Sequence, residues 1–258
     1  MTRIITLALL TGALILGFGD GAGAELLEFD DVADSMLALT HVSSAGATGW
    51  DDPSVYTGDI FNLRYHIFVA IKDTLGLRDS LDGYVLDSAA LSVVIGSLVG
   101  TPGALNVHMI RRDSTGTGIY PAYDDSRSSY CRSEWVGRKI AFPYACPDSI
   151  LWQTPGATGP SDYDPTPFAS RSGLAVGQRY DLDITLWIEG IVNGVDSVSN
   201  GIMLLAGNED GGGTDYIGIR HIHPFYAGAE RTILRIWRSE PGGSSSRQAW
   251  IDDPALLK

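Results

Sequence analysis

The feature that most constrains this chain is the alternation of apolar and polar side chains at period two. In FNLRYHIFVAIK, residues 61–72, the apolar members of the pattern are Phe61, Leu63, Tyr65, Ile67, Val69 and Ile71. The polar members are Asn62, Arg64, His66 and Lys72. Because successive side chains of a strand point to opposite faces, the segment predicts a strand with one buried face and one solvated face.

The same period recurs along the chain and predicts the fold class. ALSVVIG (90–96) and ALNVHMIRR (104–112) are separated by the turn residues at 100–103, which predicts two neighbouring antiparallel strands. GIMLLAG, DYIGIRHIH and RTILRIWRS, between residues 201 and 239, are further strand-like runs. Many strands with turn clusters and little helix predict an all-β fold, an antiparallel β-sandwich, with a jelly roll as the favoured connectivity.

One segment, DLDITLWIEGIVNGVDSVSNGIMLLAG at 181–207, departs from the alternation. Four of its apolar side chains recur at i, i+3, i+4 and i+7: Ile184, Trp187, Ile188 and Ile191. This is the spacing of one helical face, so we expect one short helix around residues 184–192. Asp183 or Thr185 offers an oxygen to cap its first turn. The apolar stripe is expected to close one end of the sandwich core.

The N-terminus has the pattern of a secretory signal peptide. Arg3 precedes an apolar run at 4–18, and the small residues 22–24 then predict cleavage before Glu25. Residues 1–24 are therefore expected to be removed, and the protein to be secreted or held at a cell surface. The mature chain has no apolar stretch of about 18 residues, so no membrane span is expected in it. Residues 25–238 are predicted to form one β-sandwich domain and 239–258 a C-terminal tail.

Charge and cysteine content limit the partners and the chemistry. The formal net charge is −13, which repels phosphate backbones and excludes nucleic acid as an expected partner while leaving cations and neutral glycans open. Cys131 and Cys146 are the only two cysteines. In an exported protein such a pair most often forms a disulfide, which we expect here; a redox or metal role is the weaker alternative.

The order of several motifs resembles the DNRLRE-type domains. In the C-terminal half these are an Asp-Ile-Thr turn with hydrophobic residues at helical spacing, two Asn-Gly pairs with the second leading into GIMLLAG, and a final strand after an Arg. ILWQTPGATGPSDYD is similar to the family's Trp-x-Thr-x-Gly-Ala segment, and IFNLRYHIFVAI with LDSAALSVVIG is similar to its N-terminal strand pair. The resemblance covers most of residues 28–238. It implies a β-sandwich module of secreted and surface proteins, some relatives of which bind carbohydrates such as alginate.

Aromatic and charged residues concentrate between the strand-like runs, from about residue 113 to 177. Aromatic planes stack on the apolar faces of sugar rings, and charged side chains take the hydroxyl groups. The predicted glycan-binding residues are Tyr120, Tyr123, Trp135, Tyr144 and Arg132. The alternative is that these aromatic residues form a small core of their own beneath a long loop.

Two groups of side chains are candidate metal ligands. The loop GNEDGGGTD at 207–215 supplies the hard oxygen ligands that calcium prefers, and the predicted ligands of a structural calcium ion are Asn208, Glu209, Asp210 and Asp215. The alternative is a solvated acidic loop. His221 and His223 share one face of a predicted strand, where they either ligate a metal or lie at the edge of the core.

No motif for catalysis occurs. The chain lacks G-x-S-x-G, H-E-x-x-H, a Walker loop and a dinucleotide fingerprint. The favoured hypothesis is a non-catalytic module that binds extracellular polysaccharide or surface glycan. A structural or adhesive subunit that self-associates in an envelope or filament is the alternative, and a polysaccharide-degrading enzyme is the least favoured of the three.

Overall fold

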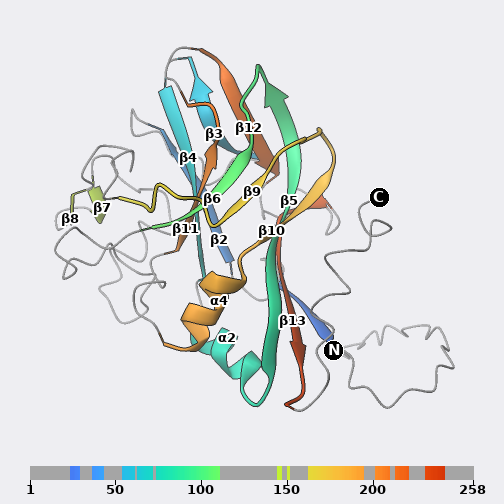
Figure 1. Cartoon of the computed structure of the whole chain (residues 1–258). Coiled ribbons are helices and arrows are strands. Elements are labelled where there is room, and N and C mark those ends of the chain that lie inside the picture. The colour runs from blue at the N-terminus through green and yellow to red at the C-terminus, as the bar shows by residue number, and fades with distance from the viewer. Residues whose placement is uncertain are drawn as a thin grey trace, which may run out of the picture.

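The computed structural model describes most of the predicted β-sandwich. The described residues are 24–29, 37–43, 54–61, 63–71, 74–110, 144–146, 150–151, 162–194, 201–209, 213–220 and 230–241. Only the backbone is described at 38, 40, 42–43, 74, 144–146 and 150–151. These parts are mostly antiparallel β-sheet with two short helices, which confirms the all-β class (Figure 1).

Two sheets share the long strand β5 (Val85–Val99). The first sheet has the order β1 (Glu25–Phe29), β13 (Ile233–Ser239), β5 and β10 (Arg179–Asp183). The second continues from the C-terminal half of β5 through β12 (Asp215–Arg220), β3 (Ser54–Ile60), β4 (Leu63–Ile71), β11 (Ile202–Ala206), β6 (Leu105–Met109) and β9 (Ala169–Arg171). β2 (Leu37–Ser43) also pairs with β4, and β7 (Tyr144–Cys146) pairs with β8 (Ile150–Leu151). The jelly-roll connectivity stays a prediction.

The predicted pairing of the strands at 90–96 and 104–112 is wrong. β5 and β6 follow each other in the chain, but β6 pairs with β11 and β9. The C-terminal half of β5 pairs instead with β12, where Tyr216 lies opposite Val99. The turn at 100–104 therefore carries the chain to a different part of the second sheet instead of closing a hairpin.

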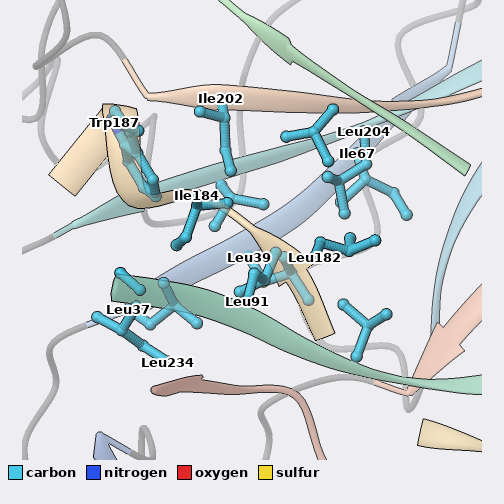
Figure 2. Packing of buried hydrophobic residues seen from close by; sticks show 14 of the residues in the cluster. Leu37, Leu39, Ile67, Leu91, Leu182, Ile184, Trp187, Ile202, Leu204 and Leu234 are labelled. Atoms are coloured by element: carbon cyan, nitrogen blue, oxygen red, sulfur yellow. The ribbon is translucent and has the colours of Figure 1, made fainter. Parts of the chain in front are cut away.

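The core lies between the two sheets. Figure 2 shows Leu91 and Leu234, from the first sheet, on one side of the core and Ile67, Ile202 and Leu204, from the second, on the other. All five side chains are fully buried. Burial of apolar surface between two sheets is the main term that holds such a fold together.

The helix α4 (Thr185–Val192) confirms the helix predicted around 184–192. The four side chains of its predicted stripe are at most 2% exposed: Ile184, Trp187, Ile188 and Ile191. The backbone N–H of Thr185 donates to Oδ1 of Asp183 at 2.9 Å, which satisfies one of the free N–H groups of the first turn. The helix ends before Gly194, whose φ of 69° is a conformation that glycine adopts without strain.

A second helix, α2 (Thr74–Leu81), was not predicted. It is two turns long and buries only Leu77 and Leu81, too few apolar positions to give a helical period in the sequence. Nε of Arg78 donates to the carbonyl oxygen of Ile191 at 2.7 Å, so α2 also satisfies a backbone acceptor at the end of α4. Both helices lie at one end of the sandwich (Figure 1).

Two parts of the prediction for residues 61–72 are wrong. β4 begins at Leu63, and Phe61 lies in the turn before it with 80% of its side-chain surface exposed instead of on the buried face. His66, predicted on the solvated face, is only 2% exposed, and Phe68 on the same face is also buried. The reason for the burial of His66 is tertiary, because Glu209 contacts it from a loop 143 residues away in the sequence.

Candidate functional site

The outer face of β4, β11 and β6 carries two buried histidines. Alternation along the strands places His66 and Phe68 opposite the core side chains Ile67 and Val69. In register, Phe68 pairs with Met203 and Met203 pairs with His108, so these three side chains form one row across the three strands. His66 lies one row further along β4. Polar side chains at such depth require hydrogen-bond partners, and two of the partners, Glu209 and Asp164, come from outside the strands.

Glu209 lies where the pairing of β4 with β11 ends. The pairing of these strands covers only Ile202 to Leu204, so the N–H of Ala206 has no acceptor on β4. Two side-chain oxygens replace that acceptor: the N–H of Ala206 donates to Oγ1 of Thr57 at 3.0 Å and to Oε1 of Glu209 at 3.2 Å. Oε1 of Glu209 also accepts from the hydroxyl of Thr57 at 3.3 Å. Oε2 lies 3.0 Å from Nε2 of His66. A single carboxylate thus joins β3, β4 and β11 where the backbone ladder has opened.

His108 is fixed in one tautomer. Its Nδ1 lies 2.7 Å from the carbonyl oxygen of Asp164, and because a carbonyl can only accept, Nδ1 carries the hydrogen. Burial lowers the pKa of His108, although the hydrogen bond to Asp164 and the nearby carboxylate of Glu209 oppose this shift. The imidazole is therefore neutral at pH 7, with Nε2 as an acceptor. Among the described residues, no group donates a hydrogen bond to this nitrogen.

Tyr163 and Arg64 complete this group of side chains. The ring of Tyr163 meets the ring of His108 edge to face, with centroids 5.1 Å apart. Burial raises the pKa of Tyr163 and the carboxylate of Glu209 adds to the increase, whereas Arg64 opposes it, so the phenol keeps its proton. We call Arg64, His66, His108, Tyr163 and Glu209 the polar cluster. It combines a guanidinium donor, a phenol, a carboxylate and a neutral imidazole acceptor on one sheet face.

The predicted calcium ligands have separate roles in the structure. Glu209 turns into the polar cluster. Nδ2 of Asn208 donates to the carbonyl oxygen of Thr101 at 2.6 Å, and Oδ1 of Asp215 accepts from the N–H of Thr101 at 2.7 Å. These two side chains hold the loop against the turn after β5, and Asp210 lies outside the described residues. The calcium site stays a prediction.

Most of the other predicted site residues lie outside the described part of the chain. These are Tyr120, Tyr123, Arg132, Trp135, His221 and His223, together with Cys131 of the predicted disulfide. Tyr144 and Cys146 are the first and last residues of β7, where only the backbone is described. The signal peptide and the tail from residue 242 also lie outside it. These predictions stay open.

Sequence reasoning identified one member of the polar cluster, Glu209, and for a different role. His108 lies between apolar neighbours in ALNVHMIRR, on the face opposite Leu105 and Val107. The alternation pattern treats His108 as a solvated residue, because it lies on the outer face of β6. In the folded protein this outer face is covered, so His108 is buried. That the face is covered becomes evident only when residues 162–164 and 209 are placed in space.

Within the described ranges no three His, Cys, Asp or Glu side chains are grouped so as to hold a metal ion, and neither helix there is long and apolar enough to cross a membrane. No protein-family model and no curated protein matches this sequence.

Proposed function

We propose that this chain is an exported, non-catalytic module that recognises carbohydrate at a cell surface or in extracellular matrix, with the polar cluster as part of its binding surface. Sugar hydroxyl groups both donate and accept hydrogen bonds, so a glycan site needs donors and acceptors side by side. The polar cluster has this composition on one sheet face.

The hydrogen bond that fixes His108 in one tautomer is the observation that carries the proposal. A buried imidazolium would favour an anionic ligand, whereas a neutral imidazole with Nδ1 bound to Asp164 presents an acceptor for a hydroxyl hydrogen. The guanidinium of Arg64 supplies donors, and the half-buried ring of Tyr163 supplies an apolar face with a polar tip. The fold agrees with such a role, because β-sandwiches commonly present binding residues at strand faces and connecting loops.

The overall charge narrows the class of glycan. The chain has a formal net charge of −13, so long-range repulsion opposes strongly anionic polymers. A neutral polysaccharide has no such penalty and is therefore the first ligand to test.

The test uses residues 25–258 in affinity electrophoresis against soluble polysaccharides and on a glycan array. We expect wild type to be retained by at least one neutral polysaccharide. Arg64→Ala and Tyr163→Phe should weaken retention, since each removes hydrogen-bonding groups, and Tyr163→Phe does so while keeping the ring. Tyr84→Ala is the matched control, because Tyr84 is exposed at the other end of β5 and stacks on Arg238.

Two results would overturn the proposal. No retention of wild type by any polysaccharide removes the binding role. The other is hydrolysis: if wild type releases reducing ends from a retained polysaccharide and Glu209→Gln does not, the protein is an enzyme and not a binding module.

A further inference from the structure

The turn between β3 and β4 breaks two local rules at Phe61. Only two residues separate the paired positions Ile60 and Leu63, and Phe61 is the one that the structure describes. Phe61 has a φ of 51°, and it has the only positive φ among the described residues that are not glycine. Short hairpin turns with positive φ favour Asn, Asp or Gly, and a bulky aromatic residue is strained there. Phe61 is also the most exposed of the large hydrophobic side chains in the described ranges, at 80%.

Strand pairing holds the backbone beneath Phe61. Beneath the turn, β3 pairs on one side with β4 and on the other with β12, so the tip is supported by a three-stranded arrangement. Gly58 allows the close approach of β12: a Cβ atom there would lie 2.9 Å from Cα of Tyr216. A bulky residue held at a positive φ costs a fold about 1–3 kcal/mol, and such strained residues cluster at ligand-binding sites. Compensation for this cost is therefore expected from a ligand.

The surroundings of the tip favour a sugar over the other apolar partners. Asp59 and Asp215 lie opposite each other in the two strands below it, and Arg64 lies opposite Asp59 on the other side. Asp59 is fully buried, so Asp215 is the carboxylate of this pair that is partly exposed, and together with the net charge of −13 it disfavours insertion into an anionic lipid surface. The carboxylate of Asp215 accepts from the N–H of Thr101 through Oδ1, and a carboxylate has room to accept from a sugar hydroxyl as well. The apolar face of a pyranose ring stacks on an aromatic plane of this size.

We propose that Phe61 is the stacking platform for a neutral sugar ring, and that the binding surface continues from this turn along β4 to the polar cluster. The proposal rests on the function proposed above and extends it by naming the residue that contacts the ring. Arg64 is the connection, because it lies three residues after Phe61 and two residues before His66, on the same face of β4 as His66.

The test compares Phe61→Gly, Phe61→Trp and Leu186→Ala in residues 25–258 against a neutral polysaccharide that retains wild type. Phe61→Gly should bind at least about tenfold more weakly, the size of effect expected when a central aromatic contact is removed. Phe61→Trp should retain binding because it keeps an aromatic plane. Leu186→Ala removes a side chain of α4 that is also exposed, and it should leave binding unchanged.

The same variants check the strain. Phe61→Gly removes the positive-φ penalty, so its thermal unfolding midpoint should rise by about 2–4 °C while binding is lost. Retention of Phe61→Gly within about twofold of wild type overturns the platform while leaving the proposed function intact. If no polysaccharide retains wild type, the proposed function is overturned, and the proposal for Phe61 is overturned with it.

Two further results would assign the exposed ring to another partner and overturn the platform. One is co-sedimentation of wild type, but not Phe61→Gly, with phosphatidylcholine vesicles. The other is concentration-dependent association of wild type in analytical ultracentrifugation that Phe61→Gly abolishes.

Discussion

The two ends of the sandwich are closed by different physical means. At the helix end, α2 and α4 cover the core with apolar side chains, and Trp187 is fully buried there. At the opposite end, the β3–β4 turn, the turn after β5 and the loop after β11 come together (Figure 1). This loop end is joined by hydrogen bonds of Glu209, Asn208 and Asp215.

The difference separates stability from function. Burial of apolar side chains stabilises the fold and does not depend on the direction of each contact. The helix end therefore contributes to stability alone. Closure by polar side chains gives less net stability per contact, but it places carboxylates, an amide and an exposed aromatic ring near one another. The loop end and the adjoining polar cluster are thus where we expect the ligand.

The largest expected effect is at the helix end. Trp187→Ala should lower the free energy of unfolding by about 3–5 kcal/mol, because it leaves a large cavity among fully buried side chains. Leu186→Ala, one residue earlier on the exposed side of α4, should change it by less than about 0.5 kcal/mol. Urea denaturation of both variants measures the two values. Similar losses in both would contradict closure by the buried stripe.

At the loop end, Gly58→Ala should cost about 3 kcal/mol. Gly58 has a φ of 112°, and a methyl group there would overlap the carbonyl oxygen of Asp215 as well as Cα of Tyr216. The matched control is Gly83→Ala near the helix end, where φ is 77° and no atom lies within 4 Å of the added carbon. That variant should lose only about 1 kcal/mol, from backbone strain alone. Equal losses in urea titrations would show that the contact with β12 has no cost.

Glu209→Ala tests the polar closure directly. It leaves the N–H of Ala206 with the hydroxyl of Thr57 as its acceptor and removes the carboxylate that contacts His66, and the expected loss of unfolding free energy is about 2 kcal/mol. Glu209→Gln keeps an oxygen for Ala206 and should lose about half as much. Hydrogen exchange should show faster exchange at Ala206 in the alanine variant than in wild type. An unchanged exchange rate would mean that the carboxylate is not the acceptor that protects this group.

The smallest expected effect is a pH dependence from His108. Its pKa is lowered by burial below the value of 6.5 expected in the unfolded chain, so protonation favours unfolding. The associated stability is present above about pH 6.5 and is lost as the pH falls toward the lowered pKa of the folded state. His108→Asn keeps an N–H for the carbonyl of Asp164 and cannot titrate, so its unfolding midpoint should fall less between pH 7 and pH 5. Identical slopes for variant and wild type would contradict the lowered pKa.

The sequence predicted the parts of the fold that depend on local periodicity. The all-β class and the helix at 185–192 follow from period two and period 3.6, because burial of one face leaves that trace in consecutive residues. The local sequence pattern did not show that β5 pairs with β12 instead of β6, because strand partners depend on contacts between segments that are distant in the chain. The prediction for β4 shows both outcomes: Ile67 and Val69 are in the core as predicted, whereas Phe61 and His66 are not where alternation put them.

The polar cluster depended on tertiary structure almost entirely. By itself the sequence determined that the outer positions of β4 and β6 hold histidines and that an acidic glycine-rich loop follows residue 206. Only the fold decided that Glu209 reaches His66, that the carbonyl of Asp164 fixes the tautomer of His108, and that Phe61 stands out in solvent. The physical reason is that hydrogen bonds and burial depend on which distant groups meet, and alternation along one strand carries no record of what covers its second face.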